Sequence, residues 1–218
     1  MNQMLTDEER ARLAMIASIV RFKKGAVIYR EGEPSDNVFN IISGVVKAYR
    51  SARYGREHIA GFLFPGDMFG LSEEGKYTNS IKAVTPVTAY RLPVSLLRPR
   101  LSQDAGLEYH VICKLCQELR QAQRHGFLLA RRQARSKLVM FLQFMEQLQA
   151  ARSEPTSEIY LPMDRSDISE YVGMSLPAVS RAFLSLTTDG IIRVRDRRHV
   201  KIVDRQAFER LAANPKNP

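Results

Sequence analysis

Residues 163–192 read MDRSDISEYVGMSLPAVSRAFLSLTTDGII, and the rest of the chain is organised around them. Asp164 is a favourable residue to cap the N-terminus of a helix, and Asp167 follows three positions later. Apolar residues then recur at helical spacing: Ile168, Tyr171 and Val172. The pattern predicts a short amphipathic helix that begins just after Asp164.

A second helix is predicted directly after the first. Gly173 can adopt the left-handed conformation that ends a helix, and Ser175 can cap the next one. Pro177 falls in the first turn of this second helix, where its missing N–H has no intrahelical partner to lose. Its apolar positions are Leu176, Val179, Phe183, Leu184 and Leu186. The sequence therefore predicts two helices joined by a tight turn.

Such a pair can act as a helix-turn-helix that binds DNA. Ser180 and Arg181 lie between the apolar positions of the second helix, and its N-terminal end is polar. In the major groove an arginine can bond through two nitrogens to O6 and N7 of guanine, so Arg181 is the leading candidate to read a base. An ordinary helical hairpin with a solvated arginine would show the same spacing.

The downstream residues predict a basic hairpin beside this pair. Gly190 is expected to close a third helix, the segment 191–195 alternates like a strand, and a second short strand covers 200–203. The turn between the strands, 196–199, reads DRRH. Four cations could contact phosphates: Arg195, Arg197, Arg198 and Lys201. A helix-turn-helix with such a hairpin is a winged helix, although a solvated turn would read similarly.

Composition limits the kind of partner and site. The 218 residues carry a net charge of +10, which indicates a polyanionic partner, either nucleic acid or an anionic membrane surface. No run approaches the ~18 apolar residues of a membrane span, and the N-terminus lacks a signal-peptide pattern, so we expect a cytoplasmic protein. The two cysteines and four histidines form no spaced ligand cluster, so neither a metal nor a cofactor is expected.

The N-terminal half predicts a short helix followed by a sheet domain. Residues 5–20 form an amphipathic pattern capped by Thr6. Brief strands separated by glycines are then expected at 26–29, 38–42, 45–49, 58–64, 81–84 and 87–92. Many short strands with frequent turns favour an antiparallel sandwich or barrel.

A long helix follows the predicted sheet domain and runs to about Leu129. Apolar residues recur at every fourth position along it: Leu107, Val111, Leu115 and Leu119. No neighbouring segment clearly covers this stripe, which suggests a seam between two chains like that of a coiled coil. The stripe could instead pack on the sheet of its own chain.

With these parts in view, the chain resembles the CRP/FNR superfamily of bacterial transcription regulators, in its FixK-like and FNR-like branch. The resemblance rests on the glycine-punctuated strands, on GREHIAGFLFPGDMFGL at 55–71, on the long helix, and on ISEYVGMSLPAVSRAFLSLTTDGII at 168–192. It implies an α+β fold with an N-terminal β-roll that resembles a cyclic-nucleotide-binding domain, a dimerisation helix and a C-terminal winged helix-turn-helix. The corresponding domains would be 1–97, 98–130 and 131–218.

The resemblance also implies a function. A homodimer would bind a palindromic operator with recognition helices ~34 Å apart, and it would act on RNA polymerase, as an activator. The DNA-binding residues would be Ser175, Leu176, Pro177, Ser180 and Arg181 of the helix-turn-helix, with the four wing cations. Many relatives have glutamate at the position of Pro177, so the base preference beside the Arg181 contact is expected to differ.

The β-roll departs from relatives that bind cyclic nucleotides. Those relatives carry an arginine–serine pair for the cyclic phosphate, whereas residues 78–80 here read TNS and contain no arginine. The N-terminal cysteine cluster of an iron–sulfur sensor is also absent from the sequence. The effector site is therefore unknown, and a β-roll that binds some other small effector stays an alternative.

A redox enzyme is a third possible class of protein. Cys113 and Cys116 have the spacing of a redox pair, but they lie inside a helical pattern, whereas thioredoxin-like pairs follow a strand and open a helix. We expect them to be packing residues on or beside the long helix.

Overall fold

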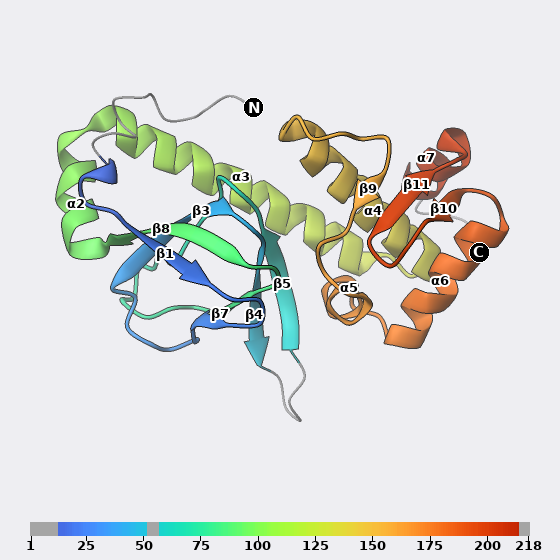
Figure 1. Cartoon of the computed structure of the whole chain (residues 1–218), viewed down its shortest axis with the longest axis horizontal. Helices are drawn as coiled ribbons and strands as arrows, with labels where there is room; N and C mark the ends of the chain where they lie inside the picture. The colour runs from blue at the N-terminus through green and yellow to red at the C-terminus, as the bar shows by residue number, and fades with distance from the viewer. Residues whose placement is uncertain (1–12, 52–56, 214–218) are drawn as a thin grey trace. The chain divides into compact units, whose positions relative to one another are not determined.

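The computed structural model describes residues 13–51 and 57–213 (Figure 1). The described chain divides into two compact units, one that extends to Ala122 and one that begins at Gln123. The boundary falls inside a single long helix, so each unit includes part of that helix. The predicted division into three domains is not tested by this result and stays a prediction.

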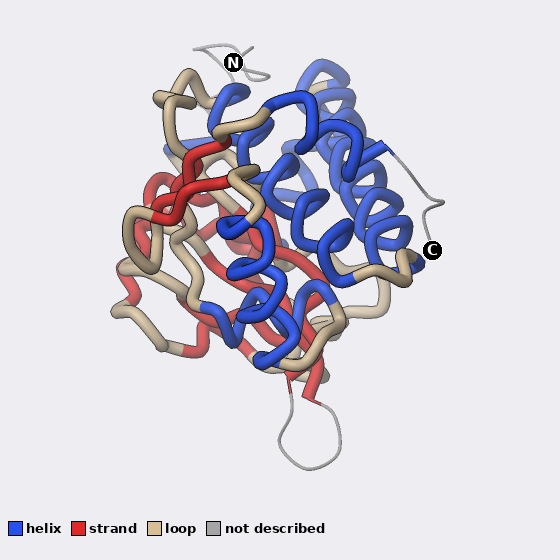
Figure 2. The backbone as a smooth tube through the Cα atoms, turned by 90° about the vertical axis from the view of Figure 1, so that its right-hand side faces the viewer, coloured by secondary structure: helices blue, strands red, loops and turns tan. Residues whose placement is uncertain are grey.

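The N-terminal unit is a β-roll of two antiparallel four-stranded sheets. One sheet has the order β1-β8-β3-β6 and the other β2-β7-β4-β5. The strands are β1 (Ser18–Phe22), β2 (Val27–Tyr29), β3 (Asn37–Ser43), β4 (Val46–Ser51), β5 (Glu57–Leu63), β6 (Met68–Phe69), β7 (Ser80–Ala83) and β8 (Val87–Pro93). Figure 2 shows these strands in red, with short loops between many of them in tan.

Side chains from both sheets fill the interior of the β-roll. Alternate residues of the strands face inward, and the largest of them are aromatic. The rings of Tyr29 and Tyr77 stack with centroids 3.5 Å apart, and Phe39 stacks on Phe69 at 5.1 Å. Burial of rings of this size is a major stabilising contribution to the domain.

All six predicted strands are confirmed within one or two residues at each end, but the sequence did not predict β1 or β6. The helix predicted over 5–20 is wrong in its last part, because Ser18–Phe22 forms β1. β1 pairs with β8, with Ile19 opposite Tyr90, and this long-range pairing outweighs the local helical spacing. The cap expected at Thr6 lies outside the described residues.

Two helices follow the β-roll, α2 (Val94–Gln103) and α3 (Ala105–Ala130). The long helix predicted to end near Leu129 is confirmed as α3. Asp104 separates the two helices: its backbone is extended, and its carboxylate accepts a 3.0 Å hydrogen bond from the backbone N–H of Leu107. That contact satisfies one of the free N–H groups of the first turn of α3.

The C-terminal unit is a winged helix-turn-helix. It contains α4 (Ala134–Ala151), β9 (Ile159–Tyr160), α5 (Arg165–Val172), α6 (Leu176–Thr188), β10 (Ile192–Val194), β11 (His199–Ile202) and α7 (Arg205–Ala213). The strands form one sheet in the order β10-β11-β9, and α4 packs against α5, α6, α7 and β9. The expected third helix before Gly190 is the C-terminal part of α6.

Candidate nucleic-acid interface

The turn between α5 and α6 has the conformation that the sequence predicted. Asp164 caps α5 by accepting a 2.9 Å hydrogen bond from Asp167 N, and Ser175 Oγ accepts one of 3.3 Å from Ala178 N. Gly173 is left-handed, with φ of 63° and ψ of 47°. These local contacts fix where α5 ends and where α6 begins.

Helix α6 buries one face and exposes the other. The buried face consists of Val179, Ala182, Phe183 and Leu186. Ser180 and Arg181 lie on the exposed face, as does Pro177 in the first turn. Leu176 and Leu184, which were grouped with the apolar positions, are exposed instead, Leu184 by 67%. At 100° per residue Leu184 falls between Ser180 and Arg181, which places it on the same stripe.

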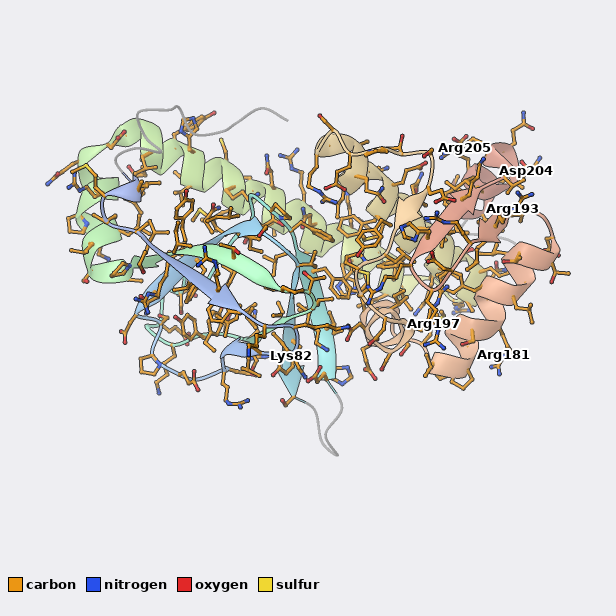
Figure 3. All side chains as sticks on the ribbon, viewed as in Figure 1. Lys82, Arg181, Arg193, Arg197, Asp204 and Arg205 are labelled. Carbon is orange, nitrogen blue, oxygen red and sulfur yellow. The ribbon has the colours of Figure 1, made fainter. Side chains whose placement is uncertain are left out.

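Arg181 is available to an external ligand. Its side chain is exposed, and within the described part of the chain no carboxylate pairs with it. In the view of Figure 3 Arg181 and Arg197 lie toward one end of the C-terminal unit, and Arg193 lies away from both. α6 therefore presents a helix face with a guanidinium group, a hydroxyl and aliphatic side chains, the groups that contact base edges in a major groove.

The hairpin turn is organised by Asp196. Its Oδ1 accepts hydrogen bonds from the backbone N–H groups of Arg198 and His199, at 2.7 and 2.9 Å, and its carboxylate also pairs with Nδ1 of His199. These hydrogen bonds hold the pKa of Asp196 below its usual value, and the bond from the backbone N–H of Arg198 contributes most. An ionised Asp196 thus keeps the turn between β10 and β11 in one conformation.

The four wing cations differ in their surroundings. Nη1 of Arg198 donates to the carbonyl oxygens of Leu161 and Pro162, so this side chain is turned toward its own unit. Arg195 forms a 3.0 Å ion pair with Glu158. Arg197 and Lys201 are exposed, and among the described residues neither has a partner. Arg197 and Lys201 are therefore the wing cations most open to a phosphate.

Two further arginines of this unit, Arg165 and Arg193, were not predicted from the sequence as candidate site residues. The Arg165 guanidinium lies 3.1 Å from the ring centroid of Phe183, and burial lowers its pKa to about 10. Among the described residues its Nη1 has no hydrogen-bond partner. Arg193 lies directly opposite Lys201 in the β10–β11 ladder, an unfavourable pairing of like charges. The strand alternation of the hairpin could have indicated Arg193, because it places Arg193 and Lys201 on the same face.

In the described part of the β-roll, the segment where relatives hold a cyclic phosphate lacks an arginine. Segment 78–80 supplies no arginine, and the buried Ser80 hydroxyl already accepts a 3.0 Å bond from Glu31 N. Lys82 and the buried Lys47 both pair with Glu57, at 3.2 and 2.5 Å. In these described strands, the cations beside the expected phosphate position are thus engaged by a carboxylate of the same chain.

The apolar side of α3 is only partly exposed. Leu107 is 3% exposed and Val111 is half-buried, whereas Leu115 and Leu119 are exposed. Tyr109, Ile112 and Cys116, which lie farther round α3 on the side away from Leu107, are also exposed. Tyr109, Ile112, Cys116 and Leu119 are spaced by three, four and three residues, which is the spacing of a coiled-coil seam.

Family models match both units of the chain. A model described as "Cyclic nucleotide-binding domain" matches residues 19–104, and one described as "Crp-like helix-turn-helix domain" matches residues 136–211. The first match covers the β-roll with α2, and the second covers α4 to α7. No helix in the described ranges is long and apolar enough to cross a membrane.

Individual proteins match over nearly the full length. The nitrogen fixation regulation protein FixK of Azorhizobium caulinodans is 31% identical over 94% of this chain and 84% of its own. The transcriptional activator protein anr of Pseudomonas aeruginosa is 28% identical over 84% of this chain and 75% of its own. The solved structure of FixK2 from Bradyrhizobium japonicum superposes with a TM-score of 0.83, at 30% identity, over 91% of this chain and 98% of that one.

Proposed function

Because the chain belongs to the CRP/FNR family of DNA-binding transcription regulators, we propose that it binds a palindromic operator as a homodimer and activates transcription there. Activation follows the names of relatives such as FixK and anr. The family consists of regulators, so the redox-enzyme hypothesis is set aside. A regulator of this kind meets its operator and RNA polymerase in the bacterial cytoplasm.

The exposed face of α6 carries this proposal. A helix whose N-terminal turns expose Pro177, Ser180 and Arg181, and whose opposite face is buried, is built to enter the major groove. Arg181 would bond to O6 and N7 of one guanine in each half-site. Ser175 and Leu176, at the very start of the helix, would contact the neighbouring backbone and bases.

The wing would bind the phosphate backbone. Arg197 and Lys201 are the free cations among the four, and Arg195 would exchange part of its pairing with Glu158 for a phosphate. Arg198 would act chiefly by holding the hairpin to the carbonyls of Leu161 and Pro162. Phosphate contacts position the protein on the duplex and carry no sequence information of their own.

The homodimer would form along α3. Two copies of the face composed of Tyr109, Ile112, Cys116 and Leu119 can pack in parallel about a two-fold axis. Of the four predicted seam residues, the exposed Leu115 and Leu119 would take part directly, and the buried Leu107 and half-buried Val111 would support α3 from its other side. A two-fold axis along α3 would make the two DNA half-sites inverted copies of each other.

Pro177 would alter the base preference beside the guanine. A glutamate at this position can accept a hydrogen bond from cytosine N4, whereas proline offers only apolar contact. The operator is therefore expected to keep the Arg181 guanine and to show weaker discrimination, or a thymine preference, at the adjacent pair.

A second candidate is a regulator whose operator affinity depends on a small effector bound by the β-roll. The family model for the β-roll favours it, although the residues that would hold a cyclic phosphate are missing. The two candidates differ in whether any small molecule changes operator affinity.

Selection from random duplex DNA with the purified full-length protein tests the proposal. The expected result is an inverted repeat with one invariant guanine per half-site, bound with an affinity on the order of 10⁻⁸ M or tighter. The selection is repeated with candidate effectors, which separates the two functions. Recovery of an unrelated, non-repeated set of sequences would contradict the dimeric operator.

A further inference from the structure

The last two turns of α3 belong to the same compact unit as the helix-turn-helix. There His125 contacts the end of α5: its Nε2 lies 2.7 Å from the carbonyl oxygen of Tyr171. A carbonyl oxygen only accepts, so Nε2 carries the proton. The imidazole also lies flat on the Tyr171 ring, with centroids 4.0 Å apart and an angle of 6° between the planes.

The next carbonyl of α5 is capped from α4. Nζ of the buried Lys137 donates a 3.2 Å hydrogen bond to the carbonyl oxygen of Val172. The last carbonyls of a helix have no intrahelical donor, so these two side chains satisfy groups that would otherwise be costly to bury. Lys137 is only 9% exposed, so this end of α5 is largely shielded from water, and burial lowers the pKa of Lys137.

The turn itself touches α3. A Cβ built on Gly173 would lie 3.0 Å from Cδ2 of Leu129, closer than an ordinary van der Waals contact, so the Leu129 side chain lies against this glycine. Met174 and the N-cap Ser175 follow directly. His125, Lys137 and Leu129 therefore hold the segment that sets where α6 starts.

We propose that His125 is a positioning residue that ties the dimer helix to the helix-turn-helix, and thereby fixes the distance between the two recognition helices. The inference rests on the proposed homodimer. α3 is one uninterrupted helix from Leu119 in the proposed seam to His125, about 9 Å along the helix axis, so no loop separates the two residues.

A contact that fixes the distance between the recognition helices affects which operator spacing is bound, whereas a contact that only stabilises the fold does not. Two recognition helices held at a fixed distance bind two half-sites at one spacing, and each inserted base pair moves a half-site by about 3.4 Å and rotates it by about a tenth of a turn. Loosening the tie lets each helix-turn-helix adjust. Operators with altered spacing should then lose less affinity relative to the selected operator.

The experiment compares the wild type with His125→Ala and His125→Gln. The glutamine amide can still donate to the Tyr171 carbonyl. His110→Ala makes the same chemical change on α3, fifteen residues from His125 and in the other unit, and serves as the matched control. Fluorescence anisotropy measures affinity for the selected operator and for versions with one base pair added or removed between half-sites, and light scattering verifies the dimer.

We expect the wild type and His110→Ala to bind the altered spacings at least tenfold more weakly than the operator. His125→Ala should bind the operator more weakly and show a spacing penalty of about threefold or less, and His125→Gln should restore most of the penalty. A folded, dimeric His125→Ala with the full wild-type penalty would overturn the inference, even if all its affinities fell together.

Leu129→Ala keeps the test decisive if His125→Ala does not fold. It removes the side chain that touches Gly173 from an exposed position, and it should also relax the spacing penalty. A full penalty in Leu129→Ala would then overturn the inference. A wild type that is monomeric, or indifferent to spacing, would instead remove the proposed dimeric operator itself and this inference with it.

Discussion

Glu118 on α3 should make the stability of the β-roll fall as pH rises. Burial, and secondarily the Asp67 carboxylate, raise the pKa of Glu118 to about 7 against the opposing effect of Lys114. Lys114 Nζ forms a 2.7 Å ion pair with Asp67, and this pairing limits how far Lys114 can stabilise the charged form of Glu118. The ordinary value is 4.5, so the unfolded chain releases this proton at lower pH than the folded chain.

The sign follows from proton linkage. The full stability is present below about pH 4.5, and part of it is lost between pH 4.5 and pH 7, because the folded state must either hold the proton or bury a charge. The shift itself corresponds to ~3 kcal/mol, but Glu118 is only partly buried and solvent screens its charge, so we expect roughly 1–2 kcal/mol. Glu118→Gln removes this penalty.

Thermal unfolding at fixed protein concentration measures the effect, since dimerisation would otherwise shift the midpoint. Glu118→Gln should raise Tm by roughly 3–6 °C at pH 8 and by much less at pH 5. Glu74→Gln, a change at an exposed carboxylate of the same unit, serves as the control and should give no such difference. An equal change in Tm at both pH values, or a lower Tm at pH 8, would refute the reasoning.

Three further predictions concern the α3 seam, the cysteines and the β-roll. Leu119→Asp should weaken dimerisation by at least tenfold in sedimentation equilibrium, because it buries an unpaired carboxylate in each half of the seam, and an unchanged dimer would place the interface elsewhere. Replacing Cys113 and Cys116 together by serine should leave operator binding equally insensitive to oxidant; an oxidant response lost in the mutant would make them sensors. Calorimetry should detect no cyclic AMP or cyclic GMP binding, because 78–80 lacks an arginine, and a micromolar dissociation constant would contradict this.

The helix-turn-helix was predictable because its signals are local. Asp164 and Ser175 cap the helices through contacts three residues away, and Gly173 stops the first by its own backbone freedom. Helix caps and a helix-ending glycine can be recognised from a few adjacent residues. The same holds for the six predicted strands, which glycines at the turns delimit.

The features that sequence reasoning missed depend on contacts far along the chain. β1 is a strand because β8 lies beside it, and β6 is two residues long and pairs only with β3. Repetition at every fourth position selected Leu107, yet the structure buries it, since a stripe drifts around a straight helix.

The candidate site shows the same limit. Arg198 was counted with the other wing cations, and only the fold reveals that its guanidinium points to the carbonyls of Leu161 and Pro162. The contact between His125 and Tyr171 could not be predicted either, because the two residues are 46 positions apart in the sequence.

Comparison of two arginine variants distinguishes a base contact by Arg181 of α6 from a phosphate contact by Arg197. Arg181→Ala and Arg197→Ala are titrated by fluorescence anisotropy against the selected operator and its guanine-substituted variants at several salt concentrations. Both residues are exposed arginines without a partner in the described chain, so they are matched controls for each other. Arg198→Ala is less suitable, because it would also release the hairpin.

Arg181→Ala should lose about 1–3 kcal/mol per half-site on the operator and should no longer distinguish the guanine-substituted variants. Arg197→Ala should weaken all sequences alike and reduce the slope of log affinity against log salt by about one per subunit. If Arg181→Ala instead weakens operator and scrambled DNA equally, Arg181 is a backbone contact and α6 is not the helix that reads the groove.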